Sequence, residues 1–118
     1  MRENVVKTKS FDFALRIVKL HQYMKKEKKE YVMSKQLLRS GTAIGAMVRE
    51  AEHAESRADF IHKMSISLKE ANESEYWMEL LYRGGYFDIL AYESIKGDLI
   101  ELLKLLISII KKAKANKK

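Results

Sequence analysis

The residue spacing best suited to metal binding is the run Glu50-Ala51-Glu52-His53. A Glu-x-x-His pair places both ligands on one face of a helix, and di-iron bundles combine two such pairs with two further glutamates. The other histidines, His21 and His62, have no glutamate three residues earlier, and the chain contains no cysteine. We therefore expect salt bridges and solvated carboxylates here, with no bound metal and no cofactor.

Catalysis has three other candidate sources, and each lacks the neighbours that it would need. Glu70 and Glu73 form a carboxylate pair on one helix face, but such pairs serve far more often as ion partners than as acid–base machinery. The serines and histidines show no nucleophile on a turn and no supported His-Asp arrangement. Gly41 and Gly45 are not a phosphate loop, because no Lys-Ser/Thr follows and no strand precedes them. The sequence predicts no enzymatic activity.

The elements that must position these residues are long helices in one domain covering residues 1–118. The chain of 118 residues is 47% apolar and 33% charged, with no proline and only five glycines, which is typical of an all-α globular domain. The predicted helices run from an N-cap at Ser10 to about Lys28, from Val32 to Ala54, from Ser56 to Gly84-Gly85, and from about Tyr92 to Lys114. Because the connections are short, we expect an antiparallel up-down-up-down four-helix bundle.

Two local patterns refine these helices. In the first helix, apolar residues recur near helical spacing and predict the buried face: Phe11, Ala14, Leu15, Val18 and Met24. In the second helix, mid-helix glycine costs about 1 kcal/mol relative to alanine, so something should offset Gly41 and Gly45. Either a neighbouring helix approaches closely there, or the helix breaks near Ser40-Gly41-Thr42 and a hydroxyl caps a second segment.

The third and fourth helices have more apolar surface than one small core can bury. The third has a main apolar stripe and a second apolar side marked by Ile66, Trp77 and Leu80. In the fourth, nearly every position from Leu99 to Ile110 outside one polar stripe is Leu or Ile, including Leu103 and Ile107. A helix with two apolar faces needs two neighbours. We expect the second neighbour to be another copy of the chain, so the protein should be a homo-oligomer.

The net charge of +7 comes from two lysine clusters, since residues 1–110 contain 18 basic and 16 acidic residues. The predicted topology places the chain ends at one pole and the other cluster at the opposite pole. The candidate contacts to phosphates of RNA or DNA are Lys7, Lys9, Lys111, Lys112, Lys114, Lys117 and Lys118 at the first pole, and Lys25, Lys26, Lys28 and Lys29 at the second. Solubility is the alternative reason for these charges, and residues 111–118 are expected to form a frayed tail.

Two segments of the second and third helices resemble a known bacterial family. They are Gln36-Leu37-Leu38-Arg39-Ser40-Gly41, followed by Arg49-Glu50-Ala51, and Glu73-Ser74-Glu75-Tyr76-Trp77. These segments resemble the four-helix-bundle proteins encoded in intervening sequences of 23S ribosomal RNA genes, and the similarity covers about residues 5–110. A more distant similarity is to the accessory protein of diversity-generating retroelements, which works with a reverse transcriptase and RNA.

This resemblance implies a homopentamer without enzymatic activity, with RNA, DNA, a reverse transcriptase or another ribonucleoprotein as candidate partners. The residues that we expect at subunit contacts or in structural roles are Gln36, Arg39, Glu50, Ile66, Glu70, Glu73, Trp77, Leu103 and Ile107. Glu75 departs from the family pattern on the apolar stripe, so it needs a partner such as Arg39 or a lysine. The N-terminus has no apolar run of signal-peptide length, and no segment is long enough to span a membrane, so we expect a cytoplasmic protein.

Overall fold

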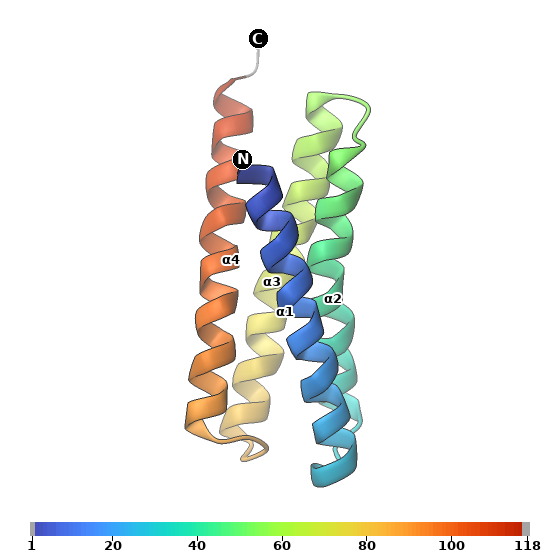
Figure 1. Ribbon diagram of the computed structural model, residues 1–118, viewed down its shortest axis with the longest axis vertical. Coiled ribbons are helices and arrows are strands. Elements are labelled where there is room, and N and C mark those ends of the chain that lie inside the picture. The colour runs from blue at the N-terminus through green and yellow to red at the C-terminus, as the bar shows by residue number, and fades with distance from the viewer. Residues whose placement is uncertain (1, 117–118) are drawn as a thin grey trace.

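The computed structural model describes the backbone of residues 2–116 and the side chains of residues 5–116. Its four long helices are α1 (Arg2–Tyr23), α2 (Val32–Glu52), α3 (Arg57–Arg83) and α4 (Ile89–Ala115). Each helix packs against its neighbours in the sequence, and α1 also packs against α4, which closes the bundle. The helices run alternately up and down, so α1 begins near the end where α4 finishes (Figure 1). The predicted all-α up-down architecture is confirmed.

The first helix begins eight residues earlier than predicted and buries a different face. It starts at Arg2, so Ser10 is not an N-cap but a buried residue within the helix, whose hydroxyl donates to the carbonyl oxygen of Lys7 at 3.1 Å. The buried side chains of α1 are Val6, Phe13, Ile17 and Leu20, with Met24 just beyond its end. Phe11 and Leu15, predicted to be core residues, are 47% and 46% exposed.

The close packing of α1 against α2 explains why α1 buries this face rather than the predicted one. A methyl group added at Gly41 would lie 3.0 Å from the side chain of Ile17, and one at Gly45 would lie 3.3 Å from the hydroxyl oxygen of Ser10. The two glycines therefore let the backbones approach closely, and they receive the α1 face that contains Ser10 and Ile17 rather than the Phe11 face. Close approach offsets the helical cost of glycine, as the first alternative predicted.

The predicted alternative, a break in the second helix, is wrong. Helix α2 continues from Val32 to Glu52 without interruption. The hydroxyl of Thr42 donates to the carbonyl oxygen of Leu38, four residues earlier, at 2.7 Å and so caps no new segment. On its other side α2 packs against α3 through buried hydroxyls, since Ser67 donates to the carbonyl oxygen of Ile44 at 2.9 Å and Ser40 lies 2.9 Å from Ser74.

The ends of α3 follow the predicted signals closely. The hydroxyl of Ser56 accepts a hydrogen bond from the N–H of Asp59 at 3.0 Å, which confirms the N-cap. At the other end, Gly85 has a φ of 89°, and the N–H of Tyr86 donates to the carbonyl oxygen of Leu81. This is the Schellman arrangement that glycine favours. Helix α4 then begins at Ile89, capped by Asp88, three residues before the predicted start.

The connection between α1 and α2 was not predicted in detail. The chain widens into a π-helical turn at Met24–Lys28, and Lys29 closes it with a φ of 54°, in the left-handed region. The buried carboxylate of Glu30 then accepts hydrogen bonds from the backbone N–H groups of Val32, Met33 and Ser34, at 2.8 to 3.1 Å. Glu30 thus satisfies the first free amides of α2, the task that a shorter N-cap side chain usually performs.

The core lies on the axis of the bundle and draws on all four helices. Its largest fully buried side chains include Phe13 of α1, Leu37 of α2, Met78 of α3 and Leu99 of α4. No helix in the described part of the chain is both long enough and apolar enough to cross a membrane. The predicted main stripe of α3 is confirmed, because Met64, Ala71 and Met78 are buried and their neighbours on this stripe are half-buried.

Candidate nucleic-acid interface and outer faces

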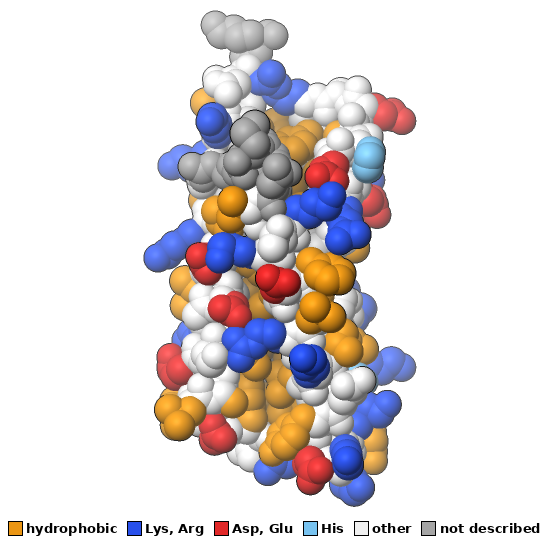
Figure 2. All heavy atoms as spheres, viewed as in Figure 1, with side chains coloured by type: hydrophobic (Ala, Val, Ile, Leu, Met, Phe, Trp, Pro, Cys, Tyr) orange, Lys and Arg blue, Asp and Glu red, His pale blue; other side chains and the backbone are white. Residues whose placement is uncertain are grey.

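One lysine cluster lies at the end of the bundle where α1 passes into α2. Lys25, Lys26, Lys28 and Lys29 are all exposed, and none forms a salt bridge with a residue that the structure describes. Figure 2 shows Lys and Arg side chains gathered at the lower end of α1 and α2. The π-helical turn and Lys29 directly after it present four lysines within five residues, with Glu27 among them. Such a concentration of unpaired positive charge attracts phosphate groups.

Two tyrosines flank this cluster and were not singled out from the sequence. Tyr23 is 43% exposed and Tyr31 is 53% exposed. Neither ring stacks on another described aromatic ring, in contrast to Tyr82 and Tyr92, whose ring centroids lie 4.2 Å apart. The signal that could have revealed them is an aromatic residue on each side of a cationic run. Free aromatic faces beside cations are what nucleic-acid bases stack on.

The opposite end carries lysines of two kinds. Lys111, Lys112 and Lys114 of α4 are exposed and form no salt bridge within the described part of the chain. Lys7 instead pairs with Glu52 at 3.1 Å, and Lys9 with Glu101 at 3.2 Å. These two lysines therefore bridge α1 to its neighbours, and their charge is partly neutralised. Lys117 and Lys118, also predicted as contacts, lie outside the described residues.

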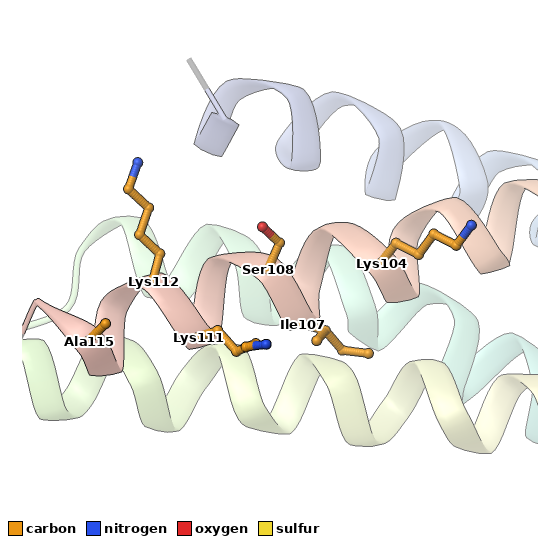
Figure 3. A pocket seen from close by; sticks show the side chains of 6 residues that line it. All are labelled: Lys104, Ile107, Ser108, Lys111, Lys112 and Ala115. Atoms are coloured by element: carbon orange, nitrogen blue, oxygen red, sulfur yellow. The ribbon is translucent and has the colours of Figure 1, made fainter.

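A shallow hollow on the outer surface of α4 brings lysines and apolar residues together. It is lined by Lys104, Ile107, Ser108, Lys111, Lys112 and Ala115. Figure 3 shows that Ser108 and Lys112 project toward α1, whereas Ile107 and Lys111 lie along the opposite edge of the helix. All six residues come from one helix, so the hollow is an exposed helix face rather than an enclosed pocket. It is open enough to meet a large partner surface.

An ion-pair cluster joins α2 to α3 where the sequence predicted structural or interface residues. Arg39 donates to Glu70 at 3.2 Å and also pairs with Glu73, which in turn accepts the indole N–H of Trp77 at 3.2 Å. The hydrogen bond from Arg39, and next that from Trp77, lower the pKa of the Glu73 carboxyl. With both carboxylates on one arginine, the cluster has a structural role between two helices, and it holds the Trp77 ring.

Two other residues of this prediction lie on α2, and one of them reaches α3. Glu50 accepts a hydrogen bond from Lys63 of α3 at 3.0 Å, and Gln36 is half-buried on α2. Glu75, half-buried on the other side of α3, does not pair with Arg39. It forms no salt bridge with a described residue, and it contributes only the weakest of the attractions that raise the pKa of Lys96 on α4, after those of Tyr92 and Glu93. Arg39 and Lys63 thus have acidic partners across the contact between α2 and α3.

The second apolar faces predicted for α3 and α4 are visible in the structure. On α3, Ile66 and Trp77 are half-buried and Leu80 is 38% exposed. On α4, Leu103 is half-buried, and Ile107 is 47% exposed. The prediction missed a third apolar surface, the Phe11 and Leu15 side of α1, and Figure 2 shows hydrophobic side chains exposed on the side of α1 and α2.

A partly buried polar contact between α1 and α2 lies within electrostatic reach of the first lysine cluster. Nδ1 of His21 is 3.0 Å from the hydroxyl oxygen of Ser34, which also donates to the carbonyl oxygen of Glu30 at 3.1 Å. Burial lowers the pKa of His21, and repulsion from Lys25 and then Lys35 lowers it further, against an opposing attraction from Glu30. The titration of His21 therefore senses the positive potential at this end of the bundle.

The residues whose spacing was tested for metal binding do not lie together. Among the residues that the structure describes, no three His, Asp or Glu side chains lie close enough together to hold a metal ion. Glu50, the glutamate of the Glu-x-x-His run, is engaged by Lys63. Its exposed surroundings are those of a surface ion pair.

Comparison with known proteins places the chain in a family. The model of the family described as 23S rRNA-intervening sequence protein matches residues 2–108. A crystal structure from Bacteroides thetaiotaomicron VPI-5482, described as a protein with unknown function from the S23 ribosomal protein family, is 63% identical. That match covers 94% of this chain and 99% of the other, with a TM-score of 0.93. No curated protein matches. The chain therefore belongs to the 23S rRNA-intervening sequence protein family.

Proposed function

We propose that this protein is a non-catalytic, homo-oligomeric helical scaffold that binds RNA or DNA weakly and without sequence preference. The observation on which the proposal chiefly rests is the division of the lysines into two groups. Lys7 and Lys9 are matched by carboxylates, whereas the lysines of the α1–α2 turn and the C-terminal part of α4 are exposed and unpaired among the described residues. If these lysines served only to join helices, each would have a carboxylate partner on a neighbouring helix.

The expected mode of binding is contact with phosphates rather than with base edges. The unpaired lysines lie at the two ends of an elongated bundle that measures 51 × 21 × 20 Å. No helix presents a row of polar side chains suited to reading a groove within residues 5–116, so lysine contacts with the backbone should dominate. Each contact is weak alone, but several copies in one assembly would add their contacts through avidity.

The proposed assembly would bury the outer apolar faces. Leu80 of α3 and Ile100 and Ile107 of α4 are 38%, 37% and 47% exposed in a single chain. Apolar side chains spread along two helices are costly to leave in water, and a second copy offers the same surface in return. The family resemblance gives five copies as the expected number, so the proposal is a homopentamer.

Binding across a salt series tests this proposal. The protein would be titrated into short fluorescent RNA and DNA probes, single- and double-stranded, from low to physiological salt. The proposal predicts an affinity that falls steeply with salt, and a shallower fall when Lys25 and Lys26, or Lys111 and Lys112, are replaced by alanine. Lys7→Ala and Lys9→Ala are matched controls that should change the salt dependence less. An absence of binding to any probe at low salt would refute a nucleic-acid role.

The alternative is a protein-interaction scaffold without a nucleic-acid role. The observation that favours it is the exposed apolar side of α1, where Phe11 and Leu15 lie next to α2 and the guanidinium of Arg49 is 5.2 Å from the centre of the Phe11 ring. A partner helix could pack on such a surface. This alternative predicts no nucleic-acid binding, with a stable oligomer that remains unchanged across the same salt series.

A further inference from the structure

The end of the bundle formed by the α1–α2 connection combines charge and aromatic surface in a way that the opposite end does not. We call this surface the lysine tip and define it by six exposed residues: Tyr23, Lys25, Lys26, Lys28, Lys29 and Tyr31. Figure 1 places it where α1 turns into α2, at the end away from the chain termini. At the other end, the exposed lysines of α4 have no exposed aromatic residue within residues 104–116.

We propose that the lysine tip binds single-stranded nucleic acid, with the lysines on phosphates and the two tyrosine rings stacked on bases. This inference rests on the proposed function and specifies its site and its ligand. Single-strand binding proteins use a cationic surface with aromatic rings on which successive bases stack. In a duplex, base faces are already stacked on one another, so exposed tyrosines gain nothing from it.

The backbone of the tip supports a role for its charges. Lys29 has a φ of 54°, a left-handed conformation that glycine adopts freely and that costs other residues about 1 kcal/mol. At the corresponding stop of α3, glycine occupies that position. The π-helical turn before Lys29 is also a rare conformation that occurs often at functional sites. Because glycine would adopt this conformation without cost, we attribute the lysine at this position to the charge that it contributes.

The position of the tip's own carboxylates leaves the lysines free. Glu30 is buried, and its oxygens accept hydrogen bonds from three backbone amides of α2, so its single negative charge forms no salt bridge with the four lysines. Glu27 is exposed and forms no salt bridge with a described residue. The lysine tip therefore keeps a net positive charge, which also contributes to the lowered pKa of His21 behind it.

An anionic membrane surface is the competing ligand, and the distribution of side chains disfavours it. The most exposed aliphatic side chain of the described residues, Leu90 at 81%, lies at the start of α4 together with Ile89. Their neighbours in the sequence are acidic, Asp88 and Glu93. A membrane site would place its cations beside the aliphatic residues. One strongly exposed aliphatic residue, Val32 at 74%, lies beside the tip. The pair Ile89 and Leu90 lies on the other connection at this end of the bundle, among carboxylates, so the lysines adjoin mainly tyrosines.

Fluorescence anisotropy of the full chain with a labelled oligouridylate of roughly 15 nucleotides tests the inference, because single-strand sites of this kind span about 4–16 nucleotides. A duplex RNA of equal length and anionic vesicles are the comparison ligands. We expect the single strand to bind more tightly than the duplex. Replacing both Tyr23 and Tyr31 by alanine should weaken binding by about thirtyfold or more, and replacing both by phenylalanine should leave it unchanged.

The salt dependence of binding tests the contribution of the lysines separately from that of the tyrosines. Lys25→Ala with Lys26→Ala should reduce the slope of log affinity against log salt by about 0.7 for each phosphate that the missing lysines had neutralised. The matched controls are Tyr76→Ala, an exposed tyrosine of α3, and Lys111→Ala with Lys112→Ala at the other end. The inference is supported if Tyr76→Ala binds like the wild type, if the Lys111 and Lys112 variant still prefers the single strand to the duplex, and if the tip variants bind the single strand more weakly than both.

Four results would overturn it, and they separate it from the proposed function. Loss of binding only with Lys111 and Lys112 would place the site at the other end and leave the proposed function standing. Equal binding of duplex and single strand, unaffected by the tyrosine variants, would show contact with phosphates alone. Binding of vesicles through the tip without binding of the oligonucleotide would identify a membrane site. If no nucleic acid and no vesicle binds, both the inference and the proposed function fail.

Discussion

Two glycine-bearing surfaces of this bundle differ in what lies opposite them. On α2, Gly41 and Gly45 face α1 so closely that an added methyl group would touch Ile17 or Ser10 at 3.0 to 3.3 Å. On α4, Gly97 is exposed, and an added methyl group would meet nothing within 4 Å. The helical cost of glycine is thus offset by close packing at the first surface, whereas a single chain contains no compensation at the second. The α2 surface is fully packed against α1, whereas the α4 surface has no neighbour within a single chain.

The largest effect is expected from filling the inner surface. Gly41→Leu should lower the free energy of unfolding by about 3 kcal/mol, because the new side chain must displace Ile17 and separate α1 from α2. Urea unfolding followed by circular dichroism measures this loss. The control is Gly97→Leu on the exposed face, which should not destabilise a single chain. Equal stability of the Gly41 variant and the wild type would contradict the close approach of α1 and α2.

A smaller effect of opposite sign is expected at the outer surface. Gly97→Ala should raise the free energy of unfolding by about 0.8 kcal/mol, because alanine is the better helix former and the added methyl group has open space. The same urea experiment, at a protein concentration low enough to separate the copies, measures it. Destabilisation at high concentration alone would indicate that another copy packs closely against Gly97. Destabilisation at every concentration would contradict the exposed position of this residue.

The smallest effect concerns His21, at the end of the contact between α1 and α2. Its pKa is lowered from 6.5 in the folded chain by burial and by the charges of Lys25 and Lys35. The unfolded chain therefore binds a proton first as the pH falls. Stability is unaffected above about pH 6.5 and decreases as the pH falls from there through the folded pKa. His21→Gln should lose less stability than the wild type between about pH 7.5 and pH 5, and urea midpoints at both pH values test this.

Much of the fold could be predicted from local signals that act alone. Ser56 and Gly84-Gly85 mark the ends of α3 through hydrogen bonds made within a few residues, so the sequence suffices to find them. The buried face of α1 could not be chosen in this way. Both the Phe11 set and the Phe13 set recur at helical spacing, and only the glycines of a different helix decide between them. The start of α1 was misplaced because Ser10, an ordinary capping residue, is small enough to be buried against Gly45.

The candidate site, too, could be predicted from the sequence only in part. The topology predicted that the two lysine clusters lie at opposite ends, because chain direction alone determines it. The pairing of Lys7 with Glu52 and of Lys9 with Glu101 depends on helix rotation, which the sequence pattern misassigned for α1. The exposure of Tyr23 and Tyr31 depends on the π-helical turn and the Glu30 cap, which have no simple sequence signal. The sequence therefore predicts where the lysines gather. It does not predict which of them form salt bridges or which have exposed aromatic neighbours.

The mass of the purified chain in solution tests the central claim most directly, namely that copies of the chain cover each other's outer apolar faces. Sedimentation equilibrium at micromolar concentration should report a particle several times heavier than the 13.8 kDa of one chain, with five copies as the expected number. Ile107→Glu should reduce this mass, whereas Val32→Glu, at an exposed position at the end of the bundle, should not. A single species of 13.8 kDa for the wild type would contradict the account.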